Sequence, residues 1–131
     1  MSKSFEEVAK RFKQIKFAEQ FDMIVAIANG GIIPAALLNQ RLNLELHLLK
    51  LNLRDAYQHQ LYEQPKLLEE IDFDFNGKRI LLVEDRVKTG TTLNYAKQLL
   101  QEAAMVKTFA VNGKADYCLY DEDCFKFPWI L

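Results

Sequence analysis

The chain has 131 residues, of which 50% are hydrophobic and 27% are charged, a balance typical of one soluble globular domain. The formal net charge of -1 argues against a protein that binds nucleic acid through many phosphate contacts. No apolar run reaches the roughly 18 residues that span a membrane, and the charged start MSKSFEEVAKRF does not look like a signal peptide. We therefore expect one cytoplasmic domain over residues 1–131, with no nucleic-acid or membrane partner.

The N-terminal part of the chain predicts a helix, a strand and a glycine turn, in that order. Apolar side chains recur at helical spacing over residues 4–20, and Ser4 followed by Glu7 is the pattern of a capping box. The continuous apolar run 23–27 is typical of a strand that is covered on both faces. It ends in residues 28–31, which read ANGG and predict a tight turn.

The middle of the chain predicts a second helix over residues 32–42, a second strand over 44–51 and a third strand over 80–83. The connection over residues 52–76 is too long for a plain loop in a compact domain. We expect a mobile functional loop in this connection, together with a short element at the edge of the sheet.

Toward the C-terminus, residues 91–104 predict a third helix, and residues 107–111 and 115–120 predict two further strands. Apolar strands that alternate with amphipathic helices indicate an α/β fold. The sequence thus predicts a single domain built on a mainly parallel, twisted sheet of about five strands flanked by helices. In such sheets, ligands bind beyond the carboxyl ends of the strands.

The strongest candidate site follows the third predicted strand, where residues 80–93 read ILLVEDRVKTGTTL. The loop 88–92 combines backbone amides at a helix start with threonine hydroxyls, which together can bind an anion. Glu84 and Asp85 repel a phosphate and suit sugar hydroxyls or a metal ion. A ribose 5-phosphate would satisfy both halves of this motif. A structural explanation is also open, in which the two acids solvate a strand end and cap the next helix.

This motif resembles the diphosphosugar-binding signature of the type I phosphoribosyltransferases, in which an apolar strand, two acids and a short variable stretch precede Thr-Gly-x-Thr-Leu. Residues 25–35, VAIANGGIIPA, resemble the pyrophosphate loop of the same family. Lys114 and residues 127–129 resemble the purine site of bacterial xanthine-guanine phosphoribosyltransferases. The resemblance extends over residues 22–131 and implies the type I phosphoribosyltransferase fold.

The resemblance also implies an activity: transfer of ribose 5-phosphate from phosphoribosyl diphosphate to a nucleobase, with release of pyrophosphate. It assigns the ribose hydroxyls and a bridging Mg²⁺ to Glu84 and Asp85, which together with Lys88 are the candidate catalytic residues. The other candidates would bind the 5-phosphate (Thr89, Gly90, Thr91, Thr92), the pyrophosphate (Asn29, Gly30, Gly31) and the base (Lys114, Trp129).

For the base, the resemblance implies a 6-oxopurine, namely hypoxanthine, guanine or xanthine. Lys114 would donate to the exocyclic oxygen and Trp129 would stack on the ring. Structural explanations remain open for both residues. In these explanations, Lys114 lies in solvent after a strand, and Trp129 packs the C-terminal part of the domain.

Two positions depart from the family pattern. Lys88 stands where the 6-oxopurine enzymes of the family usually place an aspartate, and a lysine is a poor general base at neutral pH. Asn29 stands where a basic residue is common. The alternative function is therefore a non-catalytic regulatory domain that binds phosphoribosyl diphosphate or a nucleotide. An α/β interaction domain without such a ligand is a third hypothesis.

Other residues have weaker claims to a function. His47 and His59 lack metal-ligand spacing, and Cys118 and Cys124 are interpreted as reduced thiols. Residues 121–123 form either an acidic turn or an approach to the metal. In the family, the long connection closes over the site, and here it carries Arg54, Asp55, Tyr57 and Tyr62. A chain of this size is also expected to assemble as a homodimer.

Overall fold

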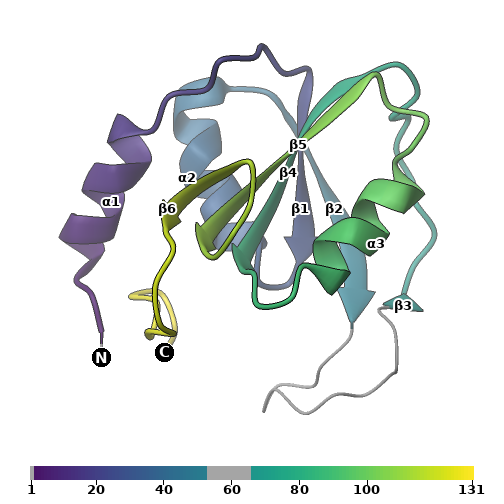
Figure 1. The fold of residues 1–131 in the computed structure, drawn as a ribbon. Helices are drawn as coiled ribbons and strands as arrows, with labels where there is room; N and C mark the ends of the chain where they lie inside the picture. The colour runs from purple at the N-terminus through teal and green to yellow at the C-terminus, as the bar shows by residue number, and fades with distance from the viewer. Residues whose placement is uncertain (1, 53–65) are drawn as a thin grey trace.

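The computed structural model describes residues 2–52 and 66–131. The elements follow in the order α1 (Phe5–Gln14), β1 (Met23–Ala28), α2 (Ile32–Leu42), β2 (Glu45–Asn52), β3 (Lys66–Leu67), β4 (Arg79–Arg86), α3 (Thr91–Leu99), β5 (Met105–Asn112) and β6 (Tyr117–Tyr120). The strands form one sheet in the order β3-β2-β1-β4-β5-β6 (Figure 1). The predicted α/β class is confirmed, with six strands in place of about five.

The centre of the sheet is parallel and deeply buried. β1 pairs in parallel with β2 and β4, β4 pairs in parallel with β5, and β5 with β6. All six residues of β1 are buried, as expected for the continuous apolar sequence MIVAIA. Because β1 and β4 are parallel neighbours, the turn after β1 and the segment after β4 lie at the same edge of the sheet.

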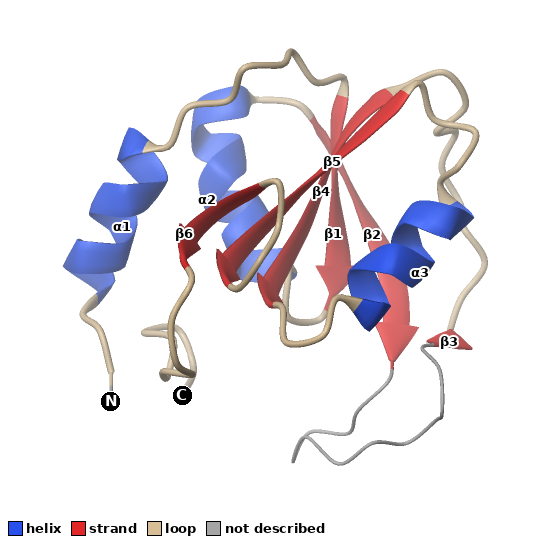
Figure 2. Cartoon of the chain, in the orientation of Figure 1, coloured by secondary structure: helices blue, strands red, loops and turns tan. Residues whose placement is uncertain are grey.

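Helices cover both faces of the sheet (Figure 2). On one face, α1 and α2 pack on a core that contains Phe12, Leu38 and Phe109. On the other face, α3 packs through Leu93 and Ala96 on a second core. The two cores draw on alternate residues of each central strand, as the period-two geometry of a strand requires.

The first helix is shorter than its periodicity predicts. Its start is as expected, since the Ser4 side chain accepts a hydrogen bond from the Glu7 amide at 3.1 Å. The helix ends at Gln14, and Ile15 is extended, with ψ at 137°. The reason is tertiary: Phe17 packs at the sheet, with its ring 4.8 Å from that of Tyr117. The apolar spacing continues past residue 14, but it serves this aromatic cluster rather than a helix.

Two C-terminal elements also differ from their predicted bounds. α3 ends at Leu99 and not at residue 104, because the following residues bind the turn before β4: Gly77 donates to Glu102 O at 3.0 Å. β6 begins at Tyr117 and not at residue 115. Asp116 instead accepts hydrogen bonds from the amide and hydroxyl of Thr108, at 2.8 and 3.1 Å.

The long connection contains the expected edge element. This is β3, which pairs antiparallel with β2 through Leu51↔Leu67. The rest of the prediction, including Arg54, Asp55, Tyr57, His59 and Tyr62, lies outside the described residues. None of the described helices has the length and apolar character that crossing a membrane would need.

Candidate functional site

A cavity of about 220 Å³ lies at the carboxyl edge of the central strands. Its walls are Ile27, Ala28 and Gly30 at the end of β1, Leu51 of β2, and the continuous run 84–93. This is the edge at which parallel α/β proteins hold ligands. The motif that carries the strongest sequence signal therefore lines one concave site.

The acid pair lies where β4 leaves the core. Glu84 Oε1 accepts a hydrogen bond from the Asp85 amide at 2.9 Å, and Asp85 Oδ1 accepts one from the Arg86 amide at 2.6 Å. Burial, reinforced by the neighbouring Asp85 carboxylate, raises the pKa of Glu84 well above its ordinary value. Glu84 thus holds its proton at higher pH than an exposed glutamate does, and in that state it can donate a hydrogen bond to an oxygen.

The turn between β1 and α2 touches the acid pair. A Cβ atom on Gly30 would lie 2.7 Å from the carboxyl carbon and both oxygens of Asp85, so only glycine leaves room for that carboxylate. A Cβ atom on Gly31 would lie 2.3 Å from Val83 O, which is rigid backbone. Asn29, whose peptide bond with Ala28 is cis, is exposed at the tip of the turn. The two glycines let two segments that are far apart in sequence meet at one site.

The loop before α3 closes the other end of the cavity. Gly90 has φ at 82°, a left-handed conformation that favours glycine. Thr89 Oγ1 and Thr91 Oγ1 lie 2.9 Å apart, and the Thr91 amide donates to Thr89 Oγ1 at 3.3 Å. The first-turn amides of a helix lack intrahelical acceptors and favour an anion. With Lys88 and Thr92 also in the wall, this end suits a phosphate.

The two residues proposed for the base are not in the cavity wall. Lys114 is exposed in the turn between β5 and β6. Trp129 stacks on Phe127, with ring centres 5.2 Å apart, and its ring centre lies 6.3 Å from that of Phe12. The structure therefore brings together the acid pair, Lys88, Gly30 and the loop 89–92, with Asn29 and Gly31 in the adjoining turn. It gives Trp129 a packing contact.

Arg86 is a cavity residue that the sequence reasoning missed. Its Nη2 donates to the carbonyl of Phe125 at 2.7 Å, and its Cζ lies 4.6 Å from the centre of the Phe127 ring. Its Nε is buried and has no hydrogen-bond partner within the described part of the chain. The available signal was a charged side chain directly after the two acids, at the end of a strand whose centre, residues 80–83, is apolar.

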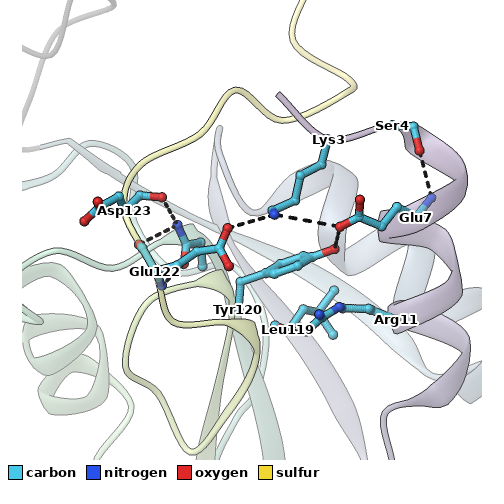
Figure 3. A network of polar contacts seen from close by, with 9 residues as sticks. Lys3, Ser4, Glu7, Arg11, Leu119, Tyr120, Glu122 and Asp123 are labelled. Carbon is cyan, nitrogen blue, oxygen red and sulfur yellow. Dashed lines mark hydrogen bonds and ion pairs between the residues drawn. The ribbon is translucent and has the colours of Figure 1, made fainter. Parts of the chain in front are cut away.

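The end of β6 and the acidic turn after it are held in place by the N-terminal residues and by β5 (Figure 3). Lys3 Nζ lies 2.8 Å from Glu122 Oε1 and 4.7 Å from the centre of the Tyr120 ring. Burial, together with a hydrogen bond of 2.9 Å to Glu7, raises the pKa of Tyr120 to about 12. Asn112 Nδ2 donates to Glu122 O at 3.1 Å. This acidic turn thus has structural partners, and residues 121–123 are not in the cavity wall.

The acid pair is the candidate metal site within the described residues. Residues 2–52 and 66–131 contain no group of three or more His, Cys, Asp or Glu side chains that could hold a metal ion. Mg²⁺ is commonly bound by one or two carboxylates together with substrate phosphates, so Glu84 and Asp85 fit an ion that arrives with a phosphorylated ligand. Cys118 and Cys124 are free thiols, and His47 stacks on Phe73 with ring centres 4.5 Å apart.

The architecture is that of solved phosphoribosyltransferases. A purine phosphoribosyltransferase from Pyrococcus horikoshii has a TM-score of 0.80 and 23% identity, covering 98% of this chain and 93% of that one. A hypothetical protein from Neisseria gonorrhoeae with bound ppGpp has a TM-score of 0.78 and 20% identity, covering 100% of this chain and 89% of that one. At these identities, the likeness concerns the fold.

The sequence comparisons define the family. The family model of the phosphoribosyl transferase domain matches residues 2–127. A xanthine-guanine phosphoribosyltransferase of Chromohalobacter salexigens is 37% identical over 115 residues, which are 83% of this chain and 68% of that protein. A second one, from Idiomarina loihiensis, is 28% identical over 119 residues, which are 86% and 73% of the two chains. The chain belongs to the type I phosphoribosyltransferase family, as its motifs indicated.

Proposed function

We propose that this protein transfers the ribose 5-phosphate group of phosphoribosyl diphosphate to a 6-oxopurine and releases pyrophosphate. The observation that carries this proposal is the cavity itself. It has the acid pair Glu84 and Asp85 in its wall, next to a helix start with a threonine-rich loop. A sugar that carries a phosphate needs both features. The curated relatives named as xanthine-guanine phosphoribosyltransferases support the choice of a 6-oxopurine.

In this mechanism, the residues of the chain act mainly by positioning. The loop 88–92 would bind the 5-phosphate, and the amides of Asn29 and Gly30 would donate backbone hydrogen bonds to the pyrophosphate. The Gly31 amide, which the sequence also assigned to the pyrophosphate, already donates to Ile27 O at 2.7 Å and so holds the turn in shape. Glu84 and Asp85 would hold the two ribose hydroxyls and so fix the anomeric carbon between base and leaving group. A base nitrogen then forms the new bond to that carbon, and pyrophosphate leaves with the electron pair of the broken bond.

We include a dependence on Mg²⁺ in the proposal. Glu84 and Asp85 would hold the ion together with the substrate, and the bound ion would neutralise charge on the departing pyrophosphate. A thermal-shift titration checks this part, because a ligand that binds the folded state raises its melting temperature. We expect phosphoribosyl diphosphate to stabilise the protein more strongly with Mg²⁺ present than with a chelator present.

The test of the activity is a panel of bases. The protein, Mg²⁺ and phosphoribosyl diphosphate are incubated with hypoxanthine, guanine, xanthine or adenine, and pyrophosphate release is measured. We expect turnover with at least one 6-oxopurine, and a loss of about a hundredfold or more in Asp85→Asn without a change in melting temperature. Release that is absent with every base, or unchanged in Asp85→Asn, contradicts the proposal.

The second candidate function is nucleotide binding without catalysis. It is favoured by Lys88, a cation in the wall of the cavity, at a position where the 6-oxopurine enzymes of the family usually place an aspartate. The fold neighbour with bound ppGpp supports it as well, since that protein holds a guanine nucleotide. Calorimetry with guanine nucleotides, run beside the base panel, separates the two functions: tight binding without any turnover favours the regulatory domain.

We also propose that the protein acts in the cytoplasm as a homodimer. Large apolar side chains lie exposed on three elements, and pairing two copies would cover such surface. These side chains are Phe5, Ile33, Leu46 and Leu48, at 51%, 41%, 37% and 37% exposure. Light scattering after size-exclusion chromatography gives the mass directly, and a mass of one chain at micromolar concentration contradicts the dimer.

A further inference from the structure

We propose that Arg86 selects the nucleobase, and that it favours a dioxopurine such as xanthine over an aminopurine such as guanine. This inference rests on the proposed function, because it names the residue that sets base preference at the same site. Three observations carry it: the place of Arg86 in the cavity wall, its contacts with the segment after β6, and a buried donor without a partner.

The order of the strands decides on which side of the cavity the base lies. β4 has β1 on one side and β5 on the other. The pyrophosphate turn follows β1, and its Gly30 lies against Asp85. Displacement at a carbon atom brings the entering group in from the side opposite the leaving group. The base therefore approaches from the other side of β4, where β5, β6 and residues 125–129 lie.

Arg86 is the cavity residue that reaches this segment. Nη2 donates to Phe125 O at 2.7 Å, and Cζ lies 4.6 Å from the centre of the Phe127 ring. Phe127 is itself only 1% exposed and stacks on Trp129. The planar guanidinium is thus held against buried aromatic rings, on the side from which the base enters. A flat, cationic group in this position can contact the edge or the face of a base.

One N–H donor of the Arg86 guanidinium has no hydrogen-bond acceptor in the described part of the chain. Its Nε is buried and unpaired within the described residues, and a buried donor without a partner is costly. Because Nε is covered by protein atoms, a base reaches it only when the guanidinium turns toward the cavity. An oxygen or an ionised ring nitrogen of the base then supplies the missing acceptor. A base that presents an amino group there brings a second donor, so Nε stays without a partner and its energetic cost remains.

Xanthine meets this requirement better than guanine. It carries oxygens at C2 and C6 and loses a ring proton readily, whereas guanine carries an amino donor at C2. That proton passes to solvent before the base binds, and the anionic base then forms the new bond through the lone pair of an imidazole nitrogen. The proton on the other imidazole nitrogen passes to solvent after the bond has formed, and pyrophosphate leaves with the electron pair of the broken bond. The negative charge of such a base suits the two cations of the wall, Arg86 and Lys88, which lie in the same cavity as the acid pair.

The test compares the kcat/KM for xanthine with that for guanine in four proteins: wild type, Arg86→Leu, Arg86→Lys and Arg41→Leu. Arg41 is the matched control, because its Nη1 also donates to a backbone carbonyl at 2.7 Å, that of Phe12, and it is outside the cavity wall. We expect the xanthine-to-guanine ratio to fall about tenfold or more in Arg86→Leu, since a hydrogen bond to a charged group is lost. The ratio should fall less in Arg86→Lys and stay unchanged in Arg41→Leu.

A ratio that is unchanged in Arg86→Leu, with an equal loss for both bases, overturns the inference and leaves the proposed function standing. Arg86→Gln replaces Arg86→Leu if the latter does not fold, with the same expected fall. Calorimetry with xanthosine and guanosine 5′-monophosphates is a second readout, and the ratio of their Kd values should shift in the same direction. A wild-type protein that neither turns over a base nor binds either nucleotide overturns the proposed function, and this inference with it.

Discussion

At the scale of single residues, Glu84 shows how a residue of the candidate site can lower the stability of the folded protein. Its carboxyl is buried next to a second carboxyl, so the charged form is disfavoured and the pKa is raised. For an acid with a raised folded-state pKa, the stabilising contribution is present below the unfolded value and is lost as pH rises through the folded value. At neutral pH, without ligand, Glu84 therefore lowers the free energy of unfolding.

We accordingly expect Glu84→Gln to raise the melting temperature of the ligand-free protein at pH 7 and to lose most of this gain at pH 4. The amide keeps the shape of the side chain without the buried charge. Glu70→Gln is the control, because Glu70 is exposed, and it should leave the melting temperature unchanged at both pH values. A lower melting temperature for Glu84→Gln at pH 7 would show that the charged carboxyl stabilises the fold.

Single residues also mark the limit of what the sequence could predict. The acid pair and the loop 88–92 were predicted as one site because their chemistry is local: they adjoin in sequence and follow one strand. Arg86 could not be assigned a role, because its partners Phe125 and Phe127 are brought to it only by the sheet order. For the same reason, the sequence leaves open whether Trp129 stacks on the base or packs the C-terminal part of the domain, where the fold places it against Phe127.

At the scale of elements, the turn between β1 and α2 contains two adjacent glycines with different roles: Gly30 serves the site and Gly31 serves the fold. Gly30→Ala would push its Cβ into the movable carboxylate of Asp85, so we expect turnover to fall about a hundredfold while the melting temperature stays near that of the wild type. Gly31→Ala would push its Cβ into the carbonyl of Val83, and we expect a loss of about 3 kcal/mol in the free energy of unfolding.

Kinetics and chemical denaturation of the two variants check this contrast. Gly77→Asn is the control: Gly77 has φ at 70° and open space around its Cβ position, and asparagine tolerates that conformation. It should change neither turnover nor unfolding. Equal effects of Gly30→Ala and Gly31→Ala on stability would contradict the assigned roles.

An ion pair joins the residue before β1, Asp22, to the first residue of β4, Arg79. Asp22 accepts hydrogen bonds from the Arg79 amide at 2.8 Å and from its Nη2 at 2.9 Å. The Arg79 side chain is the main cause that lowers the pKa of Asp22 to about 2. Because this folded pKa is depressed, the stabilisation is present above the ordinary value of 3.8 and is lost as pH falls toward 2.

We expect Asp22→Asn to lower the melting temperature at pH 6, and the difference from the wild type to shrink between pH 4 and pH 2. Added salt should also reduce the difference, since the pair is solvent-accessible. Asp74→Asn serves as the comparison. Asp74 is a carboxylate that caps a turn, because its Oδ1 accepts a hydrogen bond from the Asn76 amide at 3.0 Å. A difference for Asp22→Asn that is constant with pH would contradict the assigned role of the ion pair.

The elements themselves were largely predictable, whereas their ends were not. Each apolar strand and each amphipathic helix of the described chain appears near its predicted place. This is because burial of one face makes apolar residues recur with the repeat of the helix or strand. α1 and α3 stop early because Phe17 and Glu102 have partners elsewhere in the fold. Local periodicity cannot show such contacts. The two-residue strand β3 is too short to carry a period, although the length of its connection indicated an edge element.

At the scale of the whole molecule, Lys3 lies in the N-terminal arm, the residues that precede α1, and links this arm to the segment after β6. Lys3→Ala removes an ion pair with Glu122 and contacts with the rings of Tyr120 and Phe125. We expect a loss of about 1–2 kcal/mol in the free energy of unfolding, measured by chemical denaturation. Lys13→Ala, an exposed lysine on α1, is the control and should lose less than about 0.5 kcal/mol. Equal losses in the two variants would assign no special role to the arm.

The arm also has a consequence for the order in which the protein is made. Tyr120 and Glu7 form a hydrogen bond across 113 positions of sequence, and a ribosome delivers the earlier partner first. The contacts of Lys3, Glu7 and Arg11 with residues 119–122 therefore form only after β6 has emerged, whereas β1, α2 and β4 find their neighbours earlier. Because Arg86 binds Phe125 in the segment after β6, the side of the cavity assigned to the base is completed later in synthesis than the side assigned to the pyrophosphate.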